Sequence, residues 1–150
     1  MRKAKTILLV DDDEDDQFFF IKALSEIDNA TLYTVANNGK EALDTLENSA
    51  IPPSLIFMDI NMPMMNGIEC LAEIIQNPQT RNIPVIFLST DQSQIEPARK
   101  LGAKAFISKT ANVKQLREQI ERMINLDFIT ESHIADQTFR TAFQFSASLS

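Results

Sequence analysis

Short apolar runs alternate with amphipathic segments along most of the chain. Four runs rich in Leu, Ile, Val and Phe are typical of strands buried on both faces of a sheet. A fifth strand, with more polar residues, is expected over 31–35. The apolar runs lie at 7–10, 55–58, 85–88 and 105–107.

The segments between these strands carry apolar residues at helical spacing, i, i+3, i+4 and i+7. A Pro inside a helix removes a backbone donor and clashes with the preceding turn, so Pro97 predicts a short or kinked fourth helix within 91–101. An Asn38-Gly39 turn precedes the second helix, which carries Ala42, Leu43 and Leu46. The other helices are expected at about 15–28, 67–77 and 112–125.

Five strands alternating with five helices predict an α/β fold, with right-handed crossovers and a parallel sheet covered on both faces. Ligands of such sheets bind beyond the carboxyl ends of the strands. The chemically active side chains follow these strand ends, so we expect them to meet at one edge of the sheet. They are Asp11 and Asp12, Asp59, Ser89, and Lys109.

The net charge of −7 comes from 14 basic and 21 acidic residues, and six of the acids are consecutive, at 11–16. Without that run the balance is 14 against 15, so the acidity is local. A nearly neutral body has no basic face to follow phosphates, and no nucleic-acid partner is expected.

No apolar run approaches the roughly 20 residues that span a bilayer, so no membrane association is expected. The N-terminus does not resemble a signal peptide. One cysteine, Cys70, cannot form an internal disulfide and is expected to be a buried apolar residue on a helix. Together these features predict a soluble cytoplasmic domain.

Carboxylates gathered at strand ends bind a hard cation such as Mg²⁺ through oxygen. A nearby lysine would offset their charge and pair with a phosphoryl oxygen, and a serine hydroxyl could hold another. An aspartate among such partners is a plausible phosphoryl acceptor, because carboxylates act as nucleophiles in aspartyl-phosphate chemistry.

Four segments resemble receiver domains of two-component response regulators. Residues 7–12 (ILLVDD) resemble the family's opening strand, and residues 55–67 (LIFMDINMPMMNG) are similar to its phosphorylation loop. Residues 84–89 (PVIFLS) and 102–109 (GAKAFISK) resemble the two remaining signatures. The resemblance runs in order from about residue 5 to 126 and implies a flavodoxin-like fold with strand order 2-1-3-4-5, of the stand-alone chemotaxis-regulator type.

The resemblance also implies the role of each site residue. Asp59 would be the phosphoacceptor, and Asp11 and Asp12 the acid pair that, with Asp59, holds Mg²⁺ or Mn²⁺. Asn61 would add its backbone carbonyl to the metal. Two residues at neighbouring strand ends, Ser89 and Lys109, would contact the phosphoryl group.

The implied output is a switch rather than an enzyme. Phosphorylation would draw Ser89 inward and let Phe106 fill the vacated space. The donor would be a sensor histidine kinase or a phosphotransfer protein, and the downstream partner an unknown protein.

Three positions depart from the family's pattern. Thr110 follows Lys109 where the family usually has a proline in a cis peptide, and a non-proline cis bond costs about 3–4 kcal/mol. Thr90 stands where a small residue is common, which would narrow access to the site. Pro97 alters the fourth helix, part of the usual signalling face.

Other readings of the same residues stay open. A haloacid-dehalogenase-type phosphohydrolase would use Asp11 as its nucleophile, but Asp15 occupies its expected threonine position. A calcium loop from Asp11, Asp13 and Asp15 lacks the central glycine and has Lys22 where a bidentate Glu is needed. A receiver-like interaction module that no longer switches is a third reading.

The last two dozen residues are too short for a second domain. The expected division is a receiver domain over 1–126 and an extension over 127–150 without an output domain. The aromatic residues of the extension could dock on the domain, form a homodimer with a second copy, or stay disordered. His133, in this extension, is expected to be exposed and inert.

Overall fold

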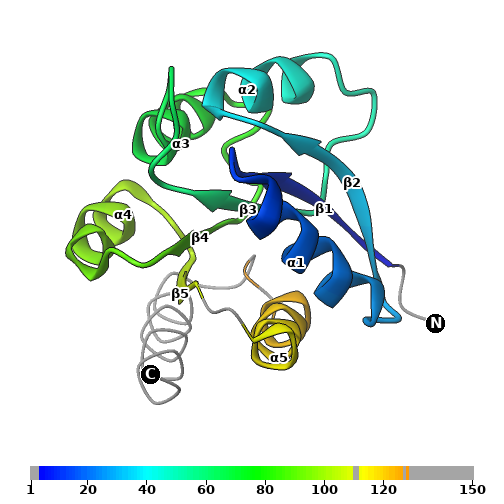
Figure 1. Cartoon of the computed structure of the whole chain (residues 1–150). Helices are drawn as coiled ribbons and strands as arrows, with labels where there is room; N and C mark the ends of the chain where they lie inside the picture. The colour runs from blue at the N-terminus through cyan, green and yellow to red at the C-terminus, as the bar shows by residue number, and fades with distance from the viewer. Residues whose placement is uncertain (1–3, 110–111, 127, 129–150) are drawn as a thin grey trace.

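The computed structural model describes residues 4–109, 112–126 and 128 (Figure 1). Five parallel strands form one sheet in the order β2-β1-β3-β4-β5, as expected. The four apolar runs and the more polar segment at 31–35 predicted the five strands within a few residues. The strands are β1 (Lys5–Val10), β2 (Ala30–Ala36), β3 (Leu55–Asp59), β4 (Val85–Ser89) and β5 (Ala105–Ser108).

Five α-helices follow the strands, and a short 3₁₀-helix, η1 (Gln92–Gln94), precedes the fourth. Polar side chains at their N-caps, such as Asp13 and Asn112, accept backbone N–H bonds that the first turn leaves unpaired. Within the described ranges, no helix is both long and apolar enough to cross a bilayer. The helices are α1 (Glu14–Ser25), α2 (Gly39–Glu47), α3 (Gly67–Gln76), α4 (Ile95–Leu101) and α5 (Val113–Ile124).

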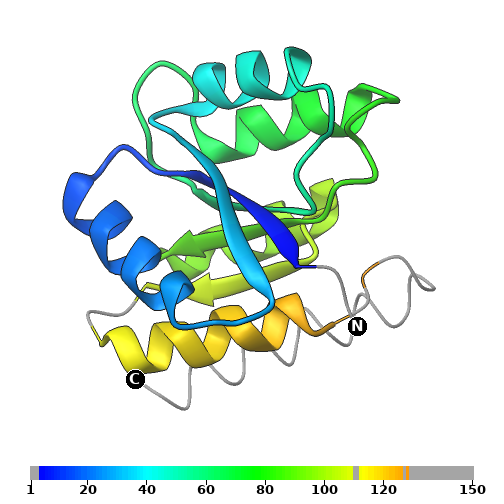
Figure 2. The same cartoon turned by 90° about the vertical axis from the view of Figure 1, so that its right-hand side faces the viewer.

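The helices cover both faces of the sheet, with α1 and α5 packed side by side on one face and α2, α3 and α4 on the other (Figures 1 and 2). Side chains of a strand point alternately to its two faces. Accordingly Ile7 and Leu9 belong to the core beneath α1 and α5, whereas Leu8 and Val10 belong to the core beneath α2 to α4.

Pro97 shortens the fourth helix, as predicted. It occupies the third residue of α4, where a missing N–H costs no helical hydrogen bond. The seven-residue helix follows η1, so the segment 92–101 changes from a tighter to a regular winding just before the proline.

Cys70 is fully buried on α3, as expected, and its thiol donates to the carbonyl of Gly39 at 3.5 Å. Burial, with the nearby Glu73 charge, raises the pKa of this thiol to about 12. The group is therefore protonated at neutral pH and behaves as a small core residue.

The core continues to the last described residue. Phe128 is only 6% exposed and joins the cluster beneath α1 and α5. The predictions for His133 and for a docked, dimerising or disordered extension fall on residues outside the described part, and the boundary at residue 126 stays a prediction.

Candidate functional site: an acidic depression at the carboxyl edge of the sheet

Most of the predicted site residues meet at one edge of the sheet. They line an open depression of about 650 Å³ at the carboxyl ends of β1, β3, β4 and β5. Asp11, directly after β1, is only 1% exposed. It joins the residues of the depression through an ion pair with Lys109. The predicted residues on the wall of the depression are Asp12, Asp59, Asn61, Ser89 and Lys109, together with Thr90.

The three acids are close enough to share one cation. Carboxylate oxygens of Asp11, Asp12 and Asp59 all lie within 4.8 Å of one another. One oxygen of each buried acid accepts a backbone N–H: Asp13 donates to Asp11 Oδ1 at 3.0 Å, and Ile60 donates to Asp59 Oδ1 at 2.8 Å. An all-oxygen set of this size fits Mg²⁺ or Mn²⁺, with water or phosphate completing the coordination.

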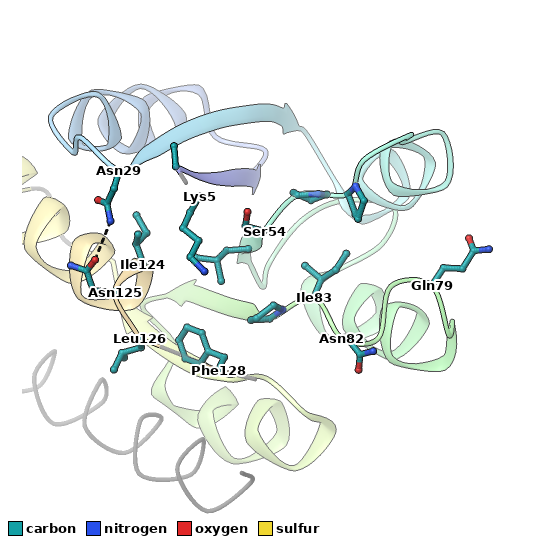
Figure 3. Close-up of a pocket in the computed structure, with 15 residues that line it drawn as sticks. Lys5, Asn29, Ser54, Gln79, Asn82, Ile83, Ile124, Asn125, Leu126 and Phe128 are labelled. Atoms are coloured by element: carbon teal, nitrogen blue, oxygen red, sulfur yellow. Dashed lines mark hydrogen bonds between the residues drawn. The ribbon is translucent and has the colours of Figure 1, made fainter. Parts of the chain in front are cut away.

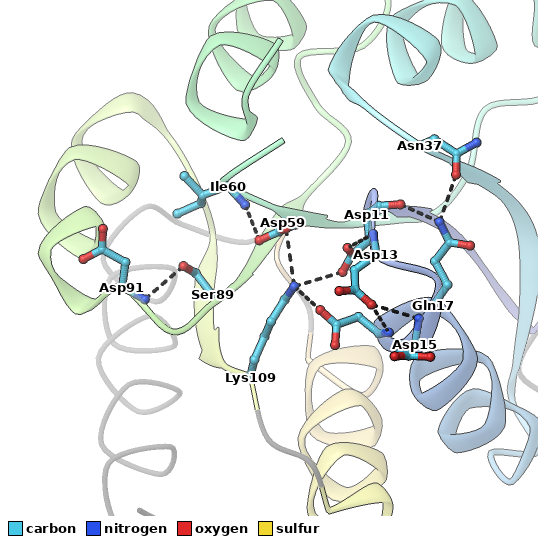
Figure 4. Close-up of polar contacts among 11 residues, drawn as sticks. Asp11, Asp13, Asp15, Gln17, Asn37, Asp59, Ile60, Ser89, Asp91 and Lys109 are labelled. Carbon is cyan, nitrogen blue, oxygen red and sulfur yellow. Dashed lines mark hydrogen bonds and ion pairs between the residues drawn. The ribbon is translucent and has the colours of Figure 1, made fainter. Parts of the chain in front are cut away.

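Lys109 points from the end of β5 into the middle of the acids (Figure 4). Its ammonium lies 3.1 Å from Asp11 Oδ2 and 3.4 Å from Asp59 Oδ2. Its backbone N–H donates to the carbonyl of Ser89 at 3.1 Å, which continues the pairing of β4 and β5 past the last strand residue. The sheet thus holds the base of this side chain.

Burial and charge shift the pKa values of these groups. Burial raises the pKa of Asp11 to about 6, against the opposing effects of the Asp13 N–H and the Lys109 charge. Burial also raises the pKa of Asp59, again opposed by Lys109. Burial alone would lower the pKa of Lys109, but its acidic partners outweigh that effect and raise it, so the ammonium stays charged.

A fourth acid belongs to this group, and the sequence did not single it out. Asp16 Oδ2 lies 2.6 Å from the Lys109 ammonium, the shortest contact that this lysine makes with an acid in the described part. Asp13 caps α1 by accepting from the N–H groups of Asp15 and Asp16, which fixes the first turn over the strand end. The only feature of the sequence that pointed to a role for Asp16 in the site was its position inside the acidic run 11–16.

The loop after Asp59 is held tightly at both ends. Gly67 donates to the carbonyl of Ile60 at 2.8 Å, and the side chains of Asn66 and Glu69 form a reciprocal cap on α3. Within this loop Met64 has a φ of +69°. This left-handed conformation costs a residue with a side chain roughly 1–2 kcal/mol. Asn61 is exposed at the start of this loop, and its role as a metal ligand stays a prediction.

Ser89, the last residue of β4, and Phe106, within the neighbouring strand β5, are both buried. The Ser89 hydroxyl accepts the N–H of Asp91 at 3.1 Å. Phe106 is 1% exposed and lies in the core beneath α2 to α4, where a ring without a hydroxyl needs no polar partner. The movement of the Phe106 ring into the space that Ser89 would vacate on phosphorylation stays a prediction. The geometry of the Lys109–Thr110 bond falls outside the described residues.

A second depression, of about 770 Å³, lies at the opposite edge of the sheet (Figure 3). It is lined by residues that precede or begin the strands, including Lys5, Ser54 and Pro84, and by Phe128. None of the predicted site residues lines it, so the candidate site is the acidic depression.

Comparison with known proteins agrees with this fold. The sequence matches the Response regulator receiver domain family over residues 7–121. It is 36% identical over 124 residues to Histidine kinase P4 of Formosa agariphila, a match that covers 81% of this chain and 9% of that protein. The chain spans 9 to 48% of the length of the first three curated relatives.

Two solved structures of response regulators match most of the fold. The phosphorylated cyanobacterial phytochrome response regulator RcpA has a TM-score of 0.71 and 32% identity, over 80% of this chain and 91% of that chain. The Mn²⁺-bound form of response regulator Rcp1 has a TM-score of 0.70 and 29% identity, over 84% and 97% of the two chains.

The chain therefore belongs to the response regulator receiver family, a class of phosphoacceptor regulatory modules rather than catalytic enzymes. The alternative hypothesis of a haloacid-dehalogenase-type phosphohydrolase is wrong, because the chain belongs to a different family. The geometry gives a physical reason as well, because Asp11 is only 1% exposed and does not line the open depression, whereas a nucleophile needs access to its substrate.

Proposed function

We propose that Asp59 accepts a phosphoryl group and that the chain acts as a stand-alone phosphorylation switch. The observation that carries this proposal is the position of Asp59 Oδ2, which faces an open depression 3.4 Å from the Lys109 ammonium. Asp11 also pairs with Lys109 but is less exposed than Asp59. Of the three acids that can share a cation, Asp59 is the one that both lines the depression and pairs with Lys109.

In the proposed reaction, an Asp59 carboxylate oxygen forms a bond to phosphorus as the donor's bond to phosphorus breaks. With a phosphohistidine donor, the imidazole leaves with the electron pair and later takes a proton. Asp11, Asp12 and Asp59, with the carbonyl of Asn61, would hold the divalent cation, which neutralises charge on the transferring group when bound. Lys109 and Ser89 would each place a donor at a phosphoryl oxygen.

The signal would leave by protein–protein contact. The Ser89 hydroxyl, which accepts the N–H of Asp91, would donate its own proton to a phosphoryl oxygen, and the ring of Phe106 would shift in the adjacent core. Such a change alters the relative stability of two states that a partner can distinguish. A sensor histidine kinase or phosphotransfer protein is the proposed donor, and buried Cys70 is compatible with a reducing cytoplasm.

Incubation with Mg²⁺ and a small acyl phosphate, followed by intact mass measurement, tests the proposal. We expect the mass to rise by one phosphoryl group, and the rise to need Mg²⁺. Asp59→Asn should abolish it, whereas Asp28→Asn, an exposed acid after α1, should not. A mass that never rises, or rises equally in Asp59→Asn, would reject phosphorylation of Asp59.

Aromatic NMR of the same samples separates a switch from the non-switching interaction module. A switch moves the Phe106 signals when fluoroberyllate and Mg²⁺ are added. Unchanged Phe106 signals in a protein that does bind fluoroberyllate would favour the module.

A further inference from the structure

The Lys109 ammonium is surrounded by three carboxylates before any phosphoryl group is present. Asp16 Oδ2 lies at 2.6 Å, Asp11 Oδ2 at 3.1 Å and Asp59 Oδ2 at 3.4 Å. A lysine ammonium has three N–H donors and no acceptor. Three acids around it can therefore engage every donor that it has.

A phosphoryl group on Asp59 needs a donor that these acids already use. On phosphorylation Asp59 becomes an acyl phosphate and loses its carboxylate charge, so one phosphoryl oxygen can take over the donor that Asp59 used. A second phosphoryl oxygen at Lys109 would have to displace Asp11 or Asp16. Asp11 has a side chain only 2% exposed, so water cannot readily replace Lys109 there, and loss of the ion pair would carry a large desolvation cost.

Asp16 is the acid that can leave at the lowest cost. Its side chain is 40% exposed on the first turn of α1, so water can replace the lysine. The turn itself stays in place, because the N–H of Asp16 is held by Asp13 Oδ1 at 3.0 Å. The carboxylate can therefore turn away from Lys109 without unwinding the helix.

We propose that Asp16 is a positioning residue that holds Lys109 in the unmodified protein and is replaced there by the phosphoryl group. This inference rests on the proposed function, since it concerns the lysine that would receive the phosphoryl oxygens. Asp16 would then oppose binding of the anion in two ways, by occupying a Lys109 donor and by its own negative charge. The same charge favours binding of the cation.

Substitution of Asp16 should therefore move the two affinities in opposite directions. In Asp16→Asn we expect fluoroberyllate to bind about fivefold more tightly at saturating Mg²⁺, the effect of one partly exposed charge pair. Mg²⁺ alone should bind more weakly than in the unchanged protein. A purely structural disturbance of the site would weaken both, so the opposed signs are the diagnostic result.

Asp15→Asn is the matched control. It removes the same charge from the same helical turn, but Asp15 is exposed and its side chain makes no ion pair with Lys109 among the described residues. Mg²⁺ affinity can be read from amide chemical shifts, and fluoroberyllate affinity from ¹⁹F NMR of the full chain.

The outcomes distinguish this inference from the proposed function. Opposed shifts in Asp16→Asn that are clearly larger than those in Asp15→Asn support the role of Asp16. Equal shifts in the two variants, or weaker binding of both ions in Asp16→Asn, overturn it while leaving phosphorylation of Asp59 intact. If the unchanged protein binds fluoroberyllate to no measurable extent, the proposed function itself fails.

Discussion

Gly67 packs directly against the backbone carbonyl of Asp59, leaving no room for a side chain. A Cβ at position 67 would overlap that oxygen and would also meet Phe87 Cε1 at 2.8 Å and the Cα of Ile60 at 2.9 Å. Two of these three neighbours are backbone atoms of the loop that carries Asp59. The glycine at the start of α3 is therefore a direct steric requirement of the candidate site.

Gly67→Ala should destabilise the protein and disturb the site together. We expect the free energy of unfolding to fall by about 1–3 kcal/mol, the usual cost of an overpacked position, because backbone must shift. Gln76→Ala, at the exposed end of the same helix, should change it by less than about 0.5 kcal/mol. Urea denaturation of both variants provides the comparison, and a neutral Gly67→Ala would contradict the steric role.

The pKa of Asp11 makes the effect of Mg²⁺ depend on pH. Its folded-state pKa of about 6 lies above the ordinary value of 3.8, so between those values the folded protein binds a proton that the unfolded chain does not. In the absence of metal this group therefore adds stability as the pH falls from about 6 to about 4.

Mg²⁺ binding should show the opposite trend, because the metal competes with that proton. We predict that thermal stabilisation by Mg²⁺ is full at pH 7.5 and declines as the pH falls through about 6. Asp28→Asn should keep this profile. A stabilisation by Mg²⁺ that stays constant from pH 7.5 to pH 5 would contradict the assignment of Asp11 to the cation site.

Removal of the Lys109 charge should separate metal binding from phosphorylation. Lys109→Met leaves Asp11 and Asp59 without their cation, so Mg²⁺ should bind more tightly and phosphorylation by acyl phosphate should slow on the order of 100-fold. Lys100→Met, an exposed lysine of α4, should change neither. Calorimetry and intact mass supply the two measurements. Phosphorylation at an unchanged rate in Lys109→Met would show that the phosphoryl group does not need this lysine.

Phe128 should contribute to the stability of the receiver fold although it follows the predicted boundary at residue 126. Because Phe128 is 6% exposed, Phe128→Ala should cost about 3–5 kcal/mol of unfolding free energy. Phe18→Ala removes the same group from a residue that is 63% exposed on α1 and should cost under about 0.5 kcal/mol. Equal effects of the two substitutions would show that the fold ends before Phe128.

Most of the fold was predictable because the central strands are buried on both faces. Such strands must be apolar throughout, which made Leu55–Asp59 and Val85–Ser89 visible as uninterrupted runs, and parallel pairing then places their carboxyl ends together. The meeting of Asp59 with Lys109, fifty positions later in the sequence, follows from topology alone. The prediction that Asp59 is the phosphoacceptor, in contrast, came from resemblance.

Other features depend on geometry that no local pattern encodes. The Asp16–Lys109 contact needs the rotation of α1 about its axis and the path of the chain after β5 to be known together. The positive φ of Met64 has no signal, because methionine is not a residue that favours that conformation. Burial of Phe128 depends on a groove assembled from strand beginnings far apart in the sequence.

The phosphoacceptor can be located directly by chemical trapping. Borohydride reduces an aspartyl phosphate to homoserine, and peptide mass spectrometry then identifies the reduced position in the acyl-phosphate-treated protein. We predict homoserine at position 59 alone, formed only when Mg²⁺ is present. Homoserine at position 11 or 12, or a phosphoryl group that survives reduction on another residue, would contradict the assignment of Asp59.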